Sequence, residues 1–131
     1  MPSRVPSNDD QLVAICRFGV GYNMVDIPAA TETGVAVVTT PEGVRRPVAT
    51  SVMAFLLALT MRLPAKSQLP HTSRVPAGVG LVGRTLGILG MGSIGAEVFR
   101  LAKPFSLDFI ACDPYADPAI AQELGAGHAY M

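Results

Sequence analysis

Short, mainly apolar runs alternate with longer polar or glycine-rich stretches along this chain. The runs lie at residues 12–16, 35–38, 85–89 and 108–112. Apolar runs of this length, with little polar alternation, are typical of strands buried on both faces of a parallel sheet. Because the stretches between them are long enough to hold helices, the pattern predicts an α/β fold with parallel strands.

Two helices are predicted in the first half of the chain. Asp26 is placed to cap a short helix, Pro28 falls in its first turn, and Gly34 is suited to end it. Residues 39–43 are expected to form a loop. Apolar residues then recur every three or four positions over residues 47–62, which predicts a long helix. Because this helix is apolar almost all round, it is expected to be buried between layers or against a partner.

Glycines and prolines punctuate the rest of the chain. Residues 63–84 contain three prolines and three glycines and are expected to form a connecting loop. Pro104 is expected to end or kink the helix that precedes it. Residues 119–124 predict a short helix that stops at Gly125, and residues 125–131 begin a third strand in this interpretation.

The stretch 85–113 carries the most specific pattern. Its first strand is followed at once by a G-x-G-x-x-G motif made of Gly90, Met91, Gly92, Ser93, Ile94 and Gly95. In such a motif the first glycine permits a tight turn, the second lets the backbone approach a pyrophosphate, and the third lets the next helix pack closely on the strand. The helix that begins there directs free N–H groups and the positive end of its dipole toward the phosphates.

An acidic residue completes this pattern. Asp113 follows the strand at 108–112 and lies about 20 residues after the glycines, where dinucleotide sites place the acid that receives the ribose hydroxyls. Its charge would repel a 2′-phosphate, which favours NAD over NADP. The alternative is a set of turn glycines with a capping or turn aspartate before Pro114. A methyltransferase with a similar loop is an alternative for 85–113 in isolation, but the residues before 85 argue against it.

A second glycine pair follows the strand at 12–16. Phe18, Gly19, Val20 and Gly21 form a loop whose backbone N–H groups can face a ligand. The alternative is a tight turn with no binding role, and spacing alone does not separate the two interpretations.

Composition limits the classes of function. The 131 residues include 10 basic and 10 acidic ones without a basic block, so neither nucleic acid nor a membrane surface is an expected partner. The longest uncharged stretch, residues 47–61, is too short to span a bilayer, and a cytoplasmic location is expected. Cys16 and Cys112 lie in apolar runs and are expected to be reduced and buried. His71 is expected to be solvated, and no metal site is predicted.

Several ordered motifs resemble the D-isomer-specific 2-hydroxyacid dehydrogenase family. They cover residues 17–21, 27–31, 39–41, 45–50, 86–95 and 113–115. The resemblance implies a two-domain α/β enzyme that moves a hydride between NAD and a small 2-hydroxy or 2-keto acid. This chain would then hold part of a flavodoxin-like substrate domain at 1–45, a long inter-domain helix and connecting loop at 46–84, and a truncated Rossmann-like parallel sheet at 85–131.

The resemblance also implies roles for the residues of the motifs. The loop matching residues 18–21 presents backbone amides to the substrate carboxylate. The loop matching Met91 to Ile94 holds the pyrophosphate, and the acid matching Asp113, followed by Pro114, holds the adenosine ribose. The helix matching 47–62 packs near the domain junction and the dimer contact, so a homodimer is expected for the parent protein.

Some positions depart from the family pattern. Asn23 stands where an aspartate is common, residues 50–52 replace a frequent Glu-x-Thr pattern, and Ser106 occupies a usual glycine. The family's catalytic arginine, its histidine and the acid that pairs with this histidine have no counterpart among the 131 residues. Neither His71 nor His128 matches the histidine in position. No catalytic residue is therefore expected here, and the chain alone is expected to be inactive.

Two other functions stay open. The family resemblance includes transcriptional corepressors that dimerise with cofactor bound, so a non-catalytic NAD-dependent dimerisation module is one alternative, although no recruitment motif is legible. A truncated fragment without independent function is the other. The shortened sheet would then expose a strand edge, which favours a homodimer, aggregation or loss of order in residues 1–45.

Overall fold

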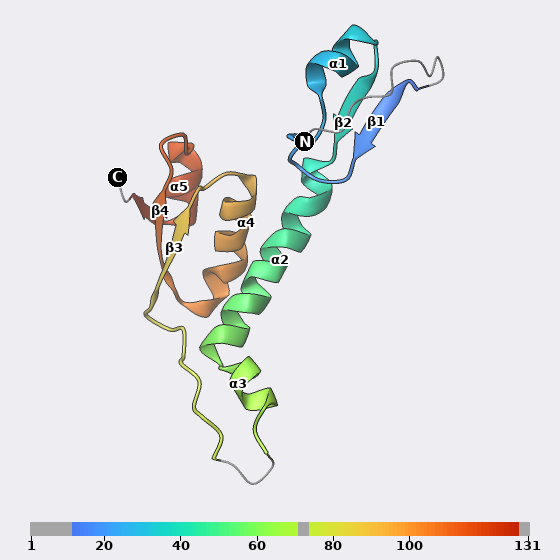
Figure 1. Ribbon diagram of the computed structural model, residues 1–131. Helices are drawn as coiled ribbons and strands as arrows, with labels where there is room; N and C mark the ends of the chain where they lie inside the picture. Colours follow the sequence, from blue (N-terminus) through green and yellow to red (C-terminus); the bar gives the residue numbers. More distant parts are fainter. Residues whose placement is uncertain (1–11, 71–73, 129–131) are drawn as a thin grey trace. The chain divides into compact units, whose positions relative to one another are not determined.

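The computed structural model describes residues 12–70 and 74–128, and the chain divides into two compact units, Met1–Val44 and Arg45–Met131. Each unit contains parallel strands joined through helices, which confirms the predicted α/β fold (Figure 1).

The first unit holds a parallel strand pair and one short helix. Strand β1 (Ala14–Arg17) pairs with β2 (Ala36–Thr39), and helix α1 (Ile27–Glu32) connects them. As predicted, the Asp26 carboxylate caps α1 by accepting the Ala29 N–H at 3.1 Å. Gly34 ends the helical turn with a φ of +69°, a left-handed conformation that favours glycine.

The second unit contains most of the helices and a three-stranded sheet. Along the chain its elements are α2 (Pro41–Thr60), which begins in the first unit, α3 (Leu63–Ser67), β3 (Thr85–Leu89), α4 (Ser93–Ala102), η1 (Lys103–Phe105), β4 (Asp108–Cys112), α5 (Pro118–Leu124) and β5 (Ala126–His128). The strands lie in the order β3-β4-β5 and all pairs are parallel. The strand predicted after Gly125 is therefore present, and α4 ends immediately before the turn that contains Pro104.

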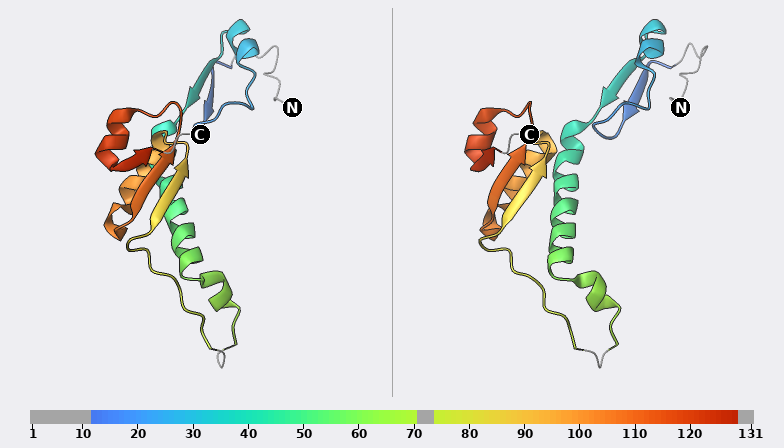
Figure 2. Two further views of the ribbon diagram at one scale, coloured as in Figure 1. Left: turned by 90° about the vertical axis from the view of Figure 1, so that its left-hand side faces the viewer. Right: turned by 60° about the vertical axis from the view of Figure 1, so that its left-hand side comes forward.

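The core of this unit lies between the sheet and α4. Side chains alternate along the strands, so that Phe109 and Ala111 of β4 are buried against the helices while Ile110 between them is 44% exposed. Phe99 of α4 is fully buried and lies against Phe109, with ring centroids 4.6 Å apart. In the left panel of Figure 2 the strands lie in front of α4, and Leu89 on β3 is 81% exposed. Among the described residues, one face of the sheet is therefore covered and the other is open.

The long helix starts earlier than predicted. The sequence predicts a loop at 39–43 and a helix from Pro47, but α2 begins at Pro41, and Pro47 lies inside it. Proline suits the first position of a helix because its φ is already helical. An N–H at this position would have no acceptor within the helix, so its absence costs nothing. Pro41 meets this condition and is the first residue of the helix, which Pro47 is not.

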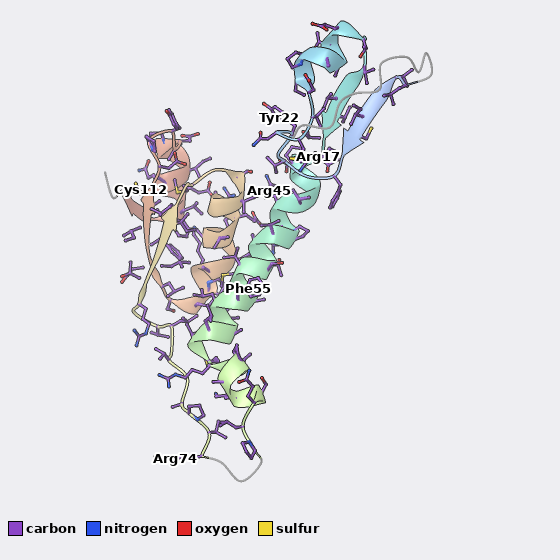
Figure 3. The ribbon with its side chains drawn as sticks, viewed as in Figure 1. Arg17, Tyr22, Arg45, Phe55, Arg74 and Cys112 are labelled. Atoms are coloured by element: carbon purple, nitrogen blue, oxygen red, sulfur yellow. The ribbon has the colours of Figure 1, made fainter. Side chains whose placement is uncertain are left out.

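The predicted burial of Cys16 was wrong. For the long helix, burial between layers is not seen among the described residues, and burial against a partner stays a prediction. Cys16 is exposed, because β1 forms a two-stranded pair in which only part of its surface is covered. On α2, Ala49 and Met53 are buried in the core, whereas Phe55 and Leu59 are 69% and 70% exposed. The helix therefore packs along one side only and is not enclosed between layers within the described residues. Figure 3 labels Phe55 on α2.

The stretch 63–84 is more ordered than a connecting loop. It contains the short helix α3, and its extended part packs on the end of α2: the Val79 N–H donates to the Thr60 carbonyl at 2.7 Å. A Cβ at Gly78 would lie 2.8 Å from Met61 Cα, closer than real Cβ atoms approach. The glycine therefore permits a close backbone crossing at this point.

The backbone conformation of Ser106 explains why a glycine is usual at this position. The residue follows η1 with a φ of +55°, and its carbonyl accepts the Gly83 N–H at 2.9 Å. A left-handed conformation costs a residue with a Cβ roughly 1 kcal/mol. The turn is thus kept at Ser106 by the contacts around it, with some backbone strain.

Candidate functional site

The glycine loop joins β3 to α4, and its three glycines have three different environments. Gly90 has a φ of +88°, which makes the turn off the strand. No atom lies within 4 Å of the point where a Cβ of Gly92 would stand, so the backbone is open to approach there. A Cβ at Gly95 would clash with the Gly90 carbonyl oxygen, so the helix packs on the loop more closely than any side chain allows.

Helix α4 presents its amino end at this loop. Its first backbone hydrogen bond runs from the Ala96 N–H to the Gly92 carbonyl at 2.9 Å. The N–H groups of Ser93, Ile94 and Gly95 precede this bond and have no acceptor within the helix. Together with the helix dipole, such groups form a site for an anion.

An open pocket of about 550 Å³ borders the loop. It is lined by Val52, Gly87, Ile88, Leu89, Gly90, Gly92, Ser93, Ile94, Gly95 and Val98. The exception within the motif is Met91, whose side chain is 3% exposed and packs into the core behind the loop. Five residues of the motif therefore border the pocket, and the sixth, Met91, anchors the loop in the core.

The structure brings Asp113 to the same loop. One carboxylate oxygen, Oδ2, accepts the Met91 N–H at 2.7 Å, and the other, Oδ1, accepts the Tyr115 N–H at 2.8 Å. The preceding residue, Cys112, labelled in Figure 3, accepts the Gly90 N–H at 2.9 Å through its carbonyl. Pro114 follows in an exposed turn. The predicted acid is thus bonded directly to the glycine loop, through the Met91 N–H between the first two glycines.

The loop after β1 belongs to the first unit. Gly19 has a φ of +139°, and its N–H donates to the Thr40 hydroxyl at 3.1 Å while the Thr40 N–H donates to the Gly19 carbonyl at 3.0 Å. Phe18 and Val20 are exposed, and no atom lies within 4 Å of a Cβ placed on Gly21. The Gly19 N–H is thus already bonded to Thr40, directly after β2, whereas the side chains of Phe18 and Val20 face solvent.

The sequence analysis does not predict an ion pair near the loop whose acidic partner is buried. The Glu97 side chain of α4 is 8% exposed, and its Oε1 lies 2.6 Å from Arg46 Nη1 of α2. Arg100 Nη1 lies 3.7 Å from the other oxygen. The spacing of Glu97 and Arg100 on one helix was an available signal. The pair with Arg46 had none, because it joins residues far apart in the sequence.

Metal ligands, membrane-spanning helices and histidines are the other features that bear on a function of the described residues. Among residues 12–70 and 74–128 no group of three or more His, Cys, Asp or Glu side chains is arranged to hold a metal ion. Within the same ranges, no helix is both long and apolar enough to cross a membrane. His71 and the side chain of His128 lie outside what the structure describes.

Comparison with known families decides the identity of the chain. Residues 4–123 match the family described as D-isomer specific 2-hydroxyacid dehydrogenase, catalytic domain. This chain belongs to that family. The family expected from the sequence motifs is thereby confirmed, and it is a family of dehydrogenases.

The relatives of this chain are named for different substrates. D-3-phosphoglycerate dehydrogenase of Methanocaldococcus jannaschii is 36% identical over an alignment of 120 residues, and the match covers 88% of this chain and 23% of that protein. The apo-structure of D-lactate dehydrogenase from Escherichia coli has a TM-score of 0.73 and 30% identity over 89% of this chain and 38% of that one. The chain therefore spans less than a quarter of the first relative and less than half of the second.

A third solved structure shares the fold. D-lactate dehydrogenase from Aquifex aeolicus, complexed with NAD and lactic acid, has a TM-score of 0.66 and 23% identity, and the match covers 92% of this chain and 37% of that one. At this level of identity the similarity concerns the fold alone.

Proposed function

We propose that this dehydrogenase chain supplies the NAD-binding portion of an oxidoreductase that acts on the CH–OH group of a D-2-hydroxy acid. The observation that carries the proposal is the contact between the glycine loop and Asp113 at the ends of adjacent parallel strands. In this proposal Gly90, Met91, Gly92, Ser93, Ile94 and Gly95 hold the pyrophosphate, and Asp113 and Pro114 receive the adenosine ribose. Phe18, Gly19, Val20 and Gly21 contribute to the substrate carboxylate site.

We propose a separate role for each end of the chain. Residues 1–45 are proposed as part of the substrate domain and residues 85–131 as part of the NAD-binding domain. The boundary between the compact units at Val44 and Arg45 supports the first limit. NAD supplies the hydride acceptor when bound, while the residues of this chain bind and orient it.

The carboxylate of Asp113 determines which cofactor fits. Each carboxylate oxygen can accept two hydrogen bonds, and each accepts one backbone N–H here, so capacity remains for the two hydroxyls of a ribose. A 2′-phosphate would instead bring negative charge against this carboxylate. We therefore propose NAD as the cofactor and not NADP.

Thermal unfolding of the 131-residue chain tests the proposed cofactor site. NAD at about 100 times its dissociation constant is expected to add roughly 2.7 kcal/mol to the native state, because it binds the folded chain and not the unfolded one. The midpoint should then rise by several degrees. NADP at the same concentration is the control and should have little effect. A cooperative transition that is indifferent to NAD, or the absence of a cooperative transition, would contradict the proposal.

The chain alone is expected to catalyse no hydride transfer. Reduction of a keto acid needs a group that donates a proton and a group that orients the carboxylate. The two histidines, His71 and His128, do not match the family's acid–base residue in position. Incubation with NADH and pyruvate, glyoxylate or hydroxypyruvate should leave the NADH absorbance unchanged. Turnover by protein free of contaminating enzymes would show this expectation to be wrong.

A further inference from the structure

Met91 lies between two glycines and is nevertheless held at two points. Its side chain is buried, and its N–H donates to Asp113 Oδ2 at 2.7 Å. Gly90 and Gly92 on either side have no Cβ to restrict them, and Gly90 adopts a left-handed conformation. A loop of this composition has much conformational entropy to lose on ordering. The contacts of Met91 therefore bear directly on which conformation the loop adopts.

Asp113 extends the contact between the strand ends by one residue. The last backbone contact between these ends runs from the Gly90 N–H to the Cys112 carbonyl at 2.9 Å. Beyond it the chain turns, with the Ala116 N–H donating to the Asp113 carbonyl, and the carboxylate side chain takes the next N–H of the loop. A hydrogen bond to a charged acceptor is roughly twice as strong as a neutral one.

The carboxylate is itself fixed in place. Its second oxygen accepts the Tyr115 N–H at 2.8 Å, which ties the side chain to its own turn. The group is half-buried, and two backbone donors hold its plane. The two oxygens that would accept the ribose hydroxyls thus already accept backbone N–H groups when no cofactor is bound.

We propose that Asp113 is a positioning residue for the glycine loop: its carboxylate holds the Met91 peptide in the binding conformation in the cofactor-free chain. This role goes beyond the proposed contact with the ribose. It is tested without any cofactor, so its failure and the failure of the proposed NAD site are separate results.

Amide hydrogen exchange of the cofactor-free 131-residue chain, followed by NMR, measures this role. Asp113→Asn keeps the shape of the side chain but replaces one acceptor oxygen by an amide group and removes the charge. Exchange at the Met91 amide is expected to accelerate about tenfold, since the contact loses about 1.4 kcal/mol of charge-assisted strength. Asp113→Ala removes both acceptors and should accelerate it further.

A matched control separates local from global effects. Asp117→Asn makes the same change at the exposed N-cap of α5, where the Asp117 carboxylate accepts the Ala119 N–H at 2.8 Å. It should accelerate exchange at Ala119 and leave Met91 unchanged. The Phe99 amide in the middle of α4 reports global opening, and rates at Met91 are compared after correction for it.

The outcomes decide the proposal. A local acceleration at Met91 in Asp113→Asn, absent from Asp117→Asn, supports it. Equal exchange at Met91 in the wild-type chain and Asp113→Asn, after the correction, overturns it, and so does an equal effect of Asp117→Asn at Met91. If Asp113→Ala does not fold, Asp113→Asn still gives the answer.

Discussion

Gly95→Ala is expected to lower the free energy of unfolding by about 3 kcal/mol, the upper end for inserting a methyl group into a packed site. The added Cβ would clash with the Gly90 carbonyl oxygen, which is backbone and has no rotamer to change. Helix α4 or the loop must therefore shift. The midpoint of thermal unfolding should fall by about 10 °C or more, and circular dichroism against temperature measures it.

Gly92→Ala is the matched control for this loop. No atom lies within 4 Å of its added Cβ, and the residue has a φ of −71°, which any residue adopts. Its stability is expected to stay within about 0.5 kcal/mol of the wild-type chain. The midpoint should no longer rise with NAD, because the methyl group occupies the side from which the pyrophosphate approaches in our proposal. Equal melting of Gly95→Ala and Gly92→Ala would show that the close approach at Gly95 is not required.

Phe99→Ala is expected to cost about 4 kcal/mol of unfolding free energy. The ring is fully buried, and removing it leaves a cavity and ends the contact with Phe109 at 4.6 Å. Domains are commonly stable by only about 5–15 kcal/mol, so the loss is a large share of the total. Urea unfolding of the wild-type and Phe99→Ala chains measures the change, provided that the slope of the unfolding free energy against urea concentration is the same for both.

Phe55→Ala provides the comparison for the core substitution. It makes the same change on α2, where the ring is 69% exposed. The expected change is within about 0.5 kcal/mol. If both substitutions shifted the urea midpoint by the same amount, burial of Phe99 would not be the source of its effect.

The parts of the fold that could be predicted depend on local sequence. The strands at 85–89 and 108–112 are apolar runs bounded by polar residues, and both are present with these limits. The cap at Asp26 and the stop at Gly125 each follow from the conformation of one residue. The glycine motif indicated the turn, because its spacing reflects a steric requirement within six residues.

The parts that could not be predicted depend on what packs from elsewhere. Periodicity shows that α2 is apolar, but not that only Ala49 and Met53 among its residues would be buried. The exposure of Cys16 depends on how many strands lie beside β1. Similarly, the motif pointed to Asp113 as a ligand for ribose, whereas its bond to the Met91 N–H appears only when the strand ends are brought together.

The crossing of Gly78 over Met61 limits how the length of this segment can vary. By composition the stretch between α3 and β3 resembles a linker, in which insertions are usually tolerated. A residue with a Cβ at the crossing would place that atom 2.8 Å from the Met61 Cα, so a shift that brings Ala77 or Val79 there is not accommodated. Such a shift would also displace the Val79 N–H from the Thr60 carbonyl. A change in the length of this segment is therefore expected to be absorbed away from the crossing, so that Gly78 keeps its place opposite Met61.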